Sequence, residues 1–321
     1  MERLLEWSLG VQRAIGFKTV LGVTYVANAA RHGNYGFNSN EVPYGAEFLP
    51  QNQDPTTGTP LPDEYFVPYP GYSSISYHQW GDNSNYHSLQ ATLDRRFAHN
   101  LTFGIAYTWS KSLDDNRSTT YLPGSLTYGP SALNRANRLT ADWVWSVPNV
   151  GEHLNNRSSR AVLDNWQVSG IASFISGGPY SASLGTTTGE NITGGGDGAR
   201  VIVTGNAVLP KGQRTFNRYF NTNVFALPAV GTIGNQWASS FYGPGVNDWD
   251  ISLMKNIPIK ERVSTQLRLD MFNAFNHTQF DSVNNSAVFD SATGKQVNTT
   301  FGQLNGDSGP RIIQVALRIS F

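Results

Sequence analysis

Nine segments of the chain alternate between apolar and polar residues. A β-strand points successive side chains to opposite faces, so each segment is predicted to be a strand with one apolar and one polar face. The alternation is clearest in residues 101–110, where every second side chain from Leu101 to Trp109 is apolar. The predicted strands are residues 6–13, 18–26, 85–97, 101–110, 138–147, 166–175, 248–255, 263–272 and 312–321.

The connections between these strands are sorted by length. Their order along the chain is short, long, short, long, medium, long, short, long. An up-and-down transmembrane barrel has short periplasmic turns and long extracellular loops, whereas a soluble sandwich has no reason to sort its loops in this way. The sequence therefore predicts an all-β fold: an antiparallel up-and-down transmembrane β-barrel segment of about nine or ten strands with long extracellular loops.

Most charged residues of the predicted strands lie on the polar face. A charge that faces lipid at mid-membrane costs about 2–4 kcal/mol, whereas a charge that faces a water-filled lumen stays solvated. Arg95 breaks the pattern at a strand end, where that cost is small. The charges on the polar face are Asp94, Asp142, Asp250, Arg268, Asp270 and Arg318. Tryptophans that could anchor the strands at the membrane interfaces are Trp7, Trp109, Trp143, Trp145, Trp166 and Trp249.

The composition is compatible with such a wall and excludes other classes. The 23 basic residues balance 23 acidic ones, so no nucleic-acid partner is expected. Charged residues make up only 14% of the chain, well below the roughly 25% of soluble domains. No apolar run is long enough for a transmembrane helix. Cysteine is absent, which excludes disulfide and thiolate chemistry.

The last predicted strand, residues 312–321, ends on an aromatic side chain. We expect it to be the closing strand of a barrel, with the C-terminus in the periplasm, and a recognition signal for the barrel-assembly machinery. The alternative is a half-buried strand of a soluble β-protein. Its apolar face, in contact with outer-membrane lipid, consists of Ile313, Val315, Leu317, Ile319 and Phe321.

The strand count and the N-terminus both predict an incomplete barrel. Nine strands would place the first and last parallel to each other, but antiparallel barrels normally have even strand numbers. Residues 1–13 lack the apolar core and cleavage site of a signal peptide. We therefore expect at least one strand to be missing upstream. Residues 312–321 should then pair with residues 263–272 and have no antiparallel partner on the other edge.

Several short motifs resemble those of a known family. They are N-Y-H-S-L-Q (85–90), Y-T-W-S-K-S-L-D-D (107–115), W-Q-V-S-G-I (166–171), F-N-T-N-V-F-A-L-P (220–228), G-T-I-G-N (231–235), G-P-G-V-N-D-W-D-I-S-L-M-K-N (243–256) and R-L-D-M-F-N-A-F-N-H-T-Q-F (268–280). In this order they resemble the C-terminal part of a TonB-dependent outer-membrane receptor barrel of the Oar-like type common in Acidobacteria. The last two motifs are the most specific.

The resemblance implies a place and a role for the chain. Family members have a barrel of about 22 strands, an N-terminal plug and a periplasmic motif that engages TonB. Residues 1–321 are then the C-terminal portion of the barrel, with plug and signal peptide absent, in the outer membrane of a Gram-negative bacterium. The TonB complex would act only through the missing upstream plug. The implied substrates are large organic molecules such as saccharides or peptides.

The residues that could support catalysis or metal binding are scattered. None of the six histidines has the helical spacing of a zinc site, and no G-x-S-x-G nucleophile motif is present. The glycine-rich residues 189–198 lack the G-K-[ST] of a phosphate loop and are expected to form a flexible outer loop. Asp114, Asp115 and Asp197 are expected to be solvated loop acids. We predict no enzyme and no catalytic, cofactor-binding or metal site.

Aromatic residues of the long segment 27–84 are candidates for ligand contact. Exposed aromatic side chains stack on sugars and peptides, but they also pack loops against each other. The candidates are Tyr65, Phe66, Tyr69, Tyr72, Tyr77 and Trp80. The predicted function is TonB-energised uptake of an organic substrate. The alternatives are a surface adhesion or structural barrel without transport, and a soluble secreted β-rich binding domain.

Overall fold

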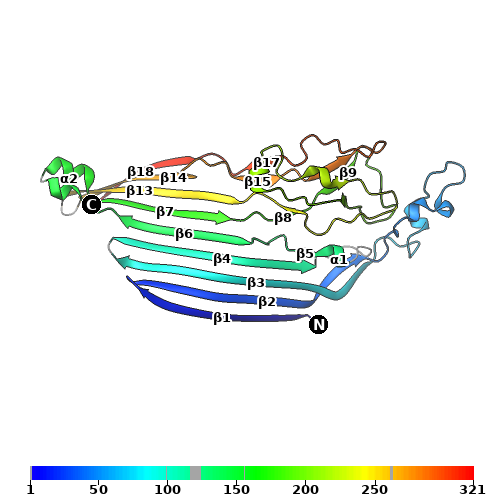
Figure 1. Ribbon diagram of the computed structural model, residues 1–321, viewed down its shortest axis with the longest axis horizontal. Coiled ribbons are helices and arrows are strands. Elements are labelled where there is room, and N and C mark those ends of the chain that lie inside the picture. The colour runs from blue at the N-terminus through cyan, green and yellow to red at the C-terminus, as the bar shows by residue number, and fades with distance from the viewer. Residues whose placement is uncertain (1, 99, 116–123, 155, 261–262) are drawn as a thin grey trace.

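The chain forms one long antiparallel sheet with a layer of loops at one end (Figure 1). The computed structural model describes residues 2–98, 100–115, 124–154, 156–260 and 263–321. The long strands are β1 (Arg3–Gly16), β2 (Thr19–Asn38), β3 (Ser76–Ala98), β4 (Leu101–Asp115), β6 (Asn137–Ser146), β7 (Trp166–Ile175), β13 (Val246–Lys260), β14 (Val263–Phe272) and β18 (Ile312–Ser320).

Shorter elements lie in the connections. The short strands are β5 (Tyr128–Pro130), β8 (Pro179–Tyr180), β9 (Ser183–Thr186), β10 (Ile202–Val203), β11 (Phe225–Ala226), β12 (Phe241–Tyr242), β15 (Phe280–Val283), β16 (Ser286–Phe289) and β17 (Leu304–Asp307). The α-helices are α1 (Gly124–Thr127) and α2 (Arg157–Leu163), and the 3₁₀ helices are η1 (Ala46–Phe48), η2 (Pro50–Asn52), η3 (Asp63–Tyr65), η4 (Gly151–Leu154), η5 (Lys211–Gln213) and η6 (Thr222–Val224). In the described ranges, no helix combines the length and the apolar character needed to cross a membrane.

The long strands follow one another as an up-and-down meander. Their order in the sheet is β1-β2-β3-β4-β6-β7-β13-β14-β18, with β5 paired to β4. All neighbours are antiparallel, so β1 and β18 run in the same direction. As predicted, β18 pairs with β14, and among the described residues no strand occupies its other edge. The predicted antiparallel sheet is confirmed, and over these residues it is not closed.

The hairpin of β2 and β3 is longer than predicted, which corrects the expected loop at residues 27–84. Strand β2 continues to Asn38, and β3 already begins at Ser76. In the extension Tyr35 pairs with Gln79, and the Tyr35 hydroxyl donates a hydrogen bond to Gln79 Oε1 at 3.1 Å. Backbone pairing is compatible with polar side chains on both faces, so these residues form a strand without an apolar–polar alternation.

Further strand ends differ from the prediction. Strand β1 runs from Arg3 to Gly16 where residues 6–13 were expected, and β4 continues through Asp115 into a segment expected to be irregular, because backbone pairing there extends beyond the apolar alternation. Strand β13 continues to Lys260, where a turn at 256–262 was expected, and its apolar alternation continues with it through Ile257 and Ile259. Residue 99 of the predicted turn at 98–100, and residues 261 and 262 of the second turn, lie outside the described residues.

The strand register sorts the sheet into an apolar and a polar face. Side chains directly opposite each other on neighbouring strands share a face, so each cross-strand row lies on one face of the sheet. One row contains Leu21, Leu93, Ile105, Ala141, Ala172 and Trp249. The adjacent row contains Val20, Asp94, Gly104, Asp142, Ile171 and Asp250. Across these six neighbouring strands the charges are therefore confined to one of the two rows, which also contains the apolar Val20 and Ile171.

The large buried side chains lie in the loops and not in the sheet. In the described part of the long strands, the fully buried apolar residues are only alanines, at positions 27, 29 and 172. The loops instead form a core, in which the rings of Phe220 and Phe241 stack at 3.8 Å between centroids. We call this core the loop lobe: Ala182, Val201, Ala207, Phe220, Phe225, Phe241, Val283, Ala287, Phe289, Phe301 and Leu304.

Candidate functional site

The long connections gather at one end of the sheet (Figure 1). Residues 39–75, 176–245 and 273–311 lie there, whereas α2 and the C-terminus lie at the other end. This arrangement confirms the sorting of connections read from the sequence. Because binding residues concentrate on loops held by a rigid scaffold, the loop end is the candidate ligand site.

The loop at residues 39–75 is held in shape by one buried amide. Asn40 is 5% exposed. Its Nδ2 donates to the carbonyl oxygens of Tyr69 at 3.2 Å, Tyr72 at 2.9 Å and Ser73 at 2.9 Å. Its Oδ1 accepts a hydrogen bond from the Tyr69 backbone N–H at 2.8 Å. Asn40 thereby fixes the backbone that carries two of the candidate aromatic residues.

Four of the six candidate aromatic residues lie on this loop. The side chains of Tyr65, Tyr69 and Tyr72 are 68%, 53% and 70% exposed, and Phe66 is half-buried. The exposed rings present flat apolar surfaces to solvent on a backbone that is already ordered. Such rings can stack on a sugar or a peptide at low entropic cost.

The other two candidates, Tyr77 and Trp80, lie on strand β3 and not in a loop. This corrects their expected position, and the reason is the longer β2–β3 hairpin. Tyr77 packs against Phe37 of β2 at 5.3 Å between ring centroids. Both candidates are still about half exposed, at 52% and 53%. Because they are three residues apart in a regularly paired part of β3, they lie on opposite faces of the projecting hairpin, separate from the loop tyrosines.

The glycine-rich residues 189–198 are packed against the loop at 39–75. Three backbone hydrogen bonds join the two segments: Gly45 to the Thr193 carbonyl at 2.8 Å, Glu47 to that of Gly194 at 3.0 Å, and Gly196 to that of Val42 at 2.9 Å. A Cβ at Gly195 would lie 2.9 Å from the Val42 carbonyl oxygen. We call this contact the loop seam. It corrects the expectation of a flexible loop, because glycine is needed here for close backbone approach.

A pair of carboxyl groups, Glu41 and Asp197, lies at the loop seam. Asp197 is 5% exposed, which corrects its assignment as a solvated loop acid. The Tyr44 hydroxyl donates to Asp197 Oδ2 at 3.5 Å, and Glu41 is also hydrogen-bonded to the Asp197 carboxyl group. Burial, together with the charge and hydrogen bond of Asp197, raises the pKa of Glu41 to about 7. Burial also lowers the pKa of nearby Arg200.

The acids singled out from the sequence do not form a metal site in the described residues. No group of three or more His, Cys, Asp or Glu side chains there has the geometry to hold a metal ion. Asp115 is 3% exposed, which again corrects its assignment as a solvated acid. It accepts a hydrogen bond from Thr127 Oγ1 at 2.6 Å and so joins β4 to α1.

The polar face of β13 and β14 carries a linked set of charged and polar groups. Asp270 Oδ1 accepts hydrogen bonds from Ser252 Oγ at 2.5 Å and from Arg268 Nε at 2.8 Å. Asp250 Oδ1 accepts one from the Asn273 backbone N–H at 3.1 Å. These groups border an open cavity of about 390 Å³. The polar face thus offers solvated hydrogen-bonding groups along the wall.

Two of the sequence motifs have structural roles in the loops. Phe220 and Phe225 of the motif at 220–228 are packed in the loop lobe, and Asn273 belongs to the more specific motif at 268–280. Asn273 Oδ1 accepts from the His277 backbone N–H at 2.9 Å, and its Nδ2 donates to the His277 carbonyl at 3.0 Å. These bonds shape the chain where it leaves β14. These motif residues therefore build the scaffold of the loops.

Two buried amide side chains that shape the loops were not predicted from the sequence. Gln236 bridges the backbone of Ala182, accepting from its N–H at 3.0 Å and donating to its carbonyl at 2.7 Å. Gln279 Oε1 accepts from the backbone N–H of Asn247 at 2.9 Å. Together with Asn40, these residues satisfy loop backbone groups that have no strand partner. No periodicity marks such residues, because their partners are distant in sequence.

Comparison with known proteins gives the following similarities. Residues 2–314 match the profile of the outer membrane beta barrel domain family. No curated protein matches the chain. Among solved structures, the outer membrane transporter YddB from Escherichia coli is similar at 10% identity and a TM-score of 0.48, over 99% of this chain and 32% of that one.

Two further similar structures contain FpvA proteins. FpvA of P. aeruginosa bound to heterologous pyoverdines shares 8% identity at a TM-score of 0.42, over 99% of this chain and 27% of that one. The FpvAI–pyocin S2 complex shares 9% identity at a TM-score of 0.41, over 99% of this chain and 28% of the other. The chain thus spans about a third or less of the length of these proteins.

Proposed function

The chain belongs to the outer membrane beta barrel domain family, and from this premise we propose that it forms part of the wall and the loops of a receptor for uptake of an organic substrate. The observation that carries the proposal is the separation of the two faces of the sheet. An apolar row faces lipid at no cost, and the adjacent row with Asp94, Asp142 and Asp250 faces a water-filled lumen.

The chain, residues 1–321, is on this proposal the C-terminal portion of a TonB-dependent receptor barrel of the Oar-like type. Its sequence motifs support the assignment, as does the open sheet with β1 and β18 at its edges. An open edge in hydrocarbon leaves backbone N–H and C=O groups without partners, so further strands would complete the barrel. A plug encoded upstream would engage the TonB complex.

The loop end then faces the cell exterior, and the C-terminus lies in the periplasm. The exposed tyrosines at 65, 69 and 72 would capture a saccharide or peptide. The ligand would pass along the polar face after the plug rearranges. The apolar side chains of β18, which end at Phe321, would serve as the assembly signal.

Uptake measurements in whole cells test this function. Cells that carry the intact gene and cells that lack it would receive fluorescently labelled oligosaccharide and peptide pools, with and without a protonophore. We expect accumulation only with the gene and only without the protonophore, because TonB-driven transport consumes the proton gradient. A pool that binds the cell surface equally with and without the protonophore, and does not accumulate, would support the adhesion barrel instead. Recovery of the chain in the aqueous phase without detergent would contradict both the uptake receptor and the adhesion barrel.

A further inference from the structure

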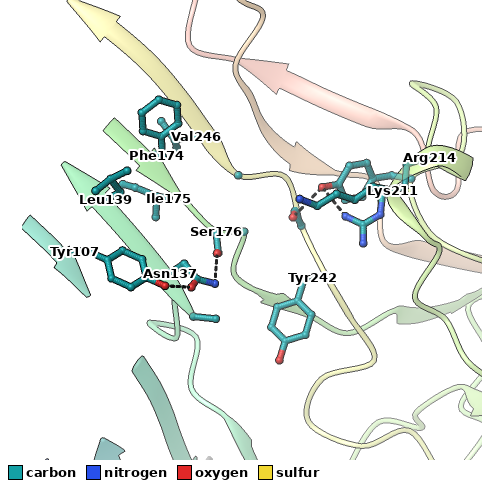
Figure 2. Close-up of a pocket in the computed structure, with 15 residues that line it drawn as sticks. Tyr107, Asn137, Leu139, Phe174, Ile175, Ser176, Lys211, Arg214, Tyr242 and Val246 are labelled. Atoms are coloured by element: carbon teal, nitrogen blue, oxygen red, sulfur yellow. Dashed lines mark hydrogen bonds between the residues drawn. The ribbon is translucent and has the colours of Figure 1, made fainter. Parts of the chain in front are cut away.

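An open groove lies where the apolar face of the sheet meets the loops (Figure 2). Its floor is made by Tyr107 of β4, Leu139 of β6 and Phe174 of β7. These residues are direct cross-strand neighbours, so their side chains share the apolar face. The groove has a volume of about 490 Å³. Its floor therefore continues the surface that, on the proposed function, is in contact with lipid.

Two cations from the loops border the other side of the groove. Figure 2 shows Lys211 and Arg214 across from the floor residues, with Tyr242 between the two groups. Arg214 is fixed in place: its Nε donates to the Leu209 carbonyl at 2.9 Å, and its guanidinium lies 5.0 Å from the ring centre of Tyr219. Lys211 is exposed on the short helix η5.

A second cavity continues the groove along the same face. It has a volume of about 370 Å³, and Tyr242 lines both cavities. Its apolar floor includes Leu89 and Trp109, which are opposite each other on β3 and β4. Lys111 contributes a third cation. Among the described residues no Asp or Glu lines either cavity, although the chain has as many acidic as basic residues.

The combination of an apolar floor and a cationic border selects one chemical class. A small soluble anion would gain nothing from the floor, and a neutral hydrocarbon would gain nothing from the cations. An amphiphile with acyl chains and a phosphorylated headgroup would use both, with its chains parallel to the strands and its phosphate at the loops. Basic pockets at the membrane surface bind anionic headgroups in this way.

We propose that this groove binds a phosphorylated acyl lipid of the outer leaflet, with the acyl chains on Tyr107, Leu139 and Phe174 and the phosphate at Lys211 and Arg214. The proposal rests on the proposed function, because it takes the apolar face to be the lipid-facing one. It assigns to η5 and its surroundings a role in anchoring the loops to the membrane surface.

Lipid titration of the purified chain in detergent micelles tests the proposal. Diphosphorylated lipid A would be added, and binding followed by native mass spectrometry. We expect Lys211→Glu to weaken binding roughly tenfold, because the variant loses the attraction of a surface cation for the anionic headgroup and adds repulsion. The matched control is Lys295→Glu, which reverses an exposed cation outside the groove and should leave binding unchanged. Equal affinity for the wild type and the Lys211 variant would overturn the proposal.

Two further experiments separate the contribution of the lipid phosphate from that of the acyl chains. Inorganic phosphate should neither bind nor compete at the same concentration, and effective competition would show a simple anion site instead. Leu139→Ser should weaken lipid binding, whereas Leu267→Ser, on the same face of β14 but outside the groove, should not. Equal losses in both leucine variants would indicate general contact with lipid and overturn the assigned groove. A failure of the proposed function would be recognised separately, by recovery of the chain without detergent.

Discussion

At the scale of single residues, the conformation of the loops is fixed mainly by buried polar side chains, and not by the glycine and aromatic residues that are conspicuous in the sequence. Asn40, Gln236 and Gln279 each satisfy backbone groups of a distant segment. An unpaired buried backbone group costs about 1–3 kcal/mol, so each such amide selects one loop conformation over many. Glu41 and Asp197 add a titratable contact to this set.

We predict that the loop seam weakens as pH rises. The pKa of Glu41 is about 7 in the folded chain, above its ordinary value of 4.5. The folded seam thus binds the proton more tightly than the open one. Its stabilisation is complete below the ordinary pKa and is lost as pH rises through the folded pKa. Amide hydrogen exchange at Gly45 and Gly196, corrected for intrinsic rates, should be faster at about pH 8 than at about pH 5.

The variant Glu41→Gln should reduce this pH dependence, because the amide keeps a hydrogen-bond donor and does not titrate. A smaller dependence should remain, because burial also raises the pKa of Glu47 in the same seam. The other ionisable groups near Asp197 should not titrate between about pH 5 and pH 8: Tyr44 stays neutral and Arg200 stays charged. Glu64→Gln, an exposed position on the same loop, is the matched control and should behave as the wild type. A seam whose exchange is independent of pH in the wild type would contradict the assignment.

At the scale of elements, the sequence predicted the strands well where one face is apolar. The bounds of β7 and β14 agree with the prediction at both ends. The prediction failed for the extension of β2 and β3, because backbone pairing there does not require apolar side chains. It also missed that residues 189–198 are packed, since a glycine run reads as flexible unless its partner, here Val42, is known.

The two faces of one strand should tolerate charge differently. Val168 and Ser169 are neighbours in β7 and lie on opposite faces: Val168 is opposite Leu253 and Ser169 opposite Ser252. We expect Val168→Lys to lower the free energy of unfolding in phospholipid vesicles by about 2 kcal/mol, and Ser169→Lys by less than about 1 kcal/mol, because only the first faces lipid. Urea titration of both variants measures the difference, and equal losses would contradict the assignment of the faces.

At the scale of the whole molecule, the sheet has two exposed edges, β1 and β18, and they run in the same direction. Antiparallel pairing of these two edges with each other is therefore impossible. The candidate site could be predicted from the sequence only in part. The sequence identified the exposed tyrosines, but their arrangement in space depends on the loop seam and on Asn40. The loop seam joins segments more than a hundred residues apart, and the partners of Asn40 lie 29 to 33 residues away, so neither contact leaves a local pattern to read.

The terminal strand should control delivery of the chain to the outer membrane. Phe321 is fully exposed, and the large apolar residues along β18 are between 52% and 70% exposed. If this face is the assembly signal, Phe321→Ser should lower the amount of protein in the outer membrane several-fold without lowering its synthesis. Quantitative immunoblots of membrane fractions measure this. The control is Ser320→Ala on the same strand, and equal amounts of the Phe321 and Ser320 variants would contradict the signal.

The loop lobe has a thermodynamic consequence for the molecule. Its phenylalanine core is buried by protein, whereas on the proposed function the apolar row of the sheet is covered by lipid hydrocarbon both when the wall is folded and when it unfolds within the membrane. The positive heat-capacity change of unfolding comes from apolar surface newly exposed to water. In a bilayer that change should then come mainly from the loop lobe, so that warming can melt the loops while the membrane wall remains folded.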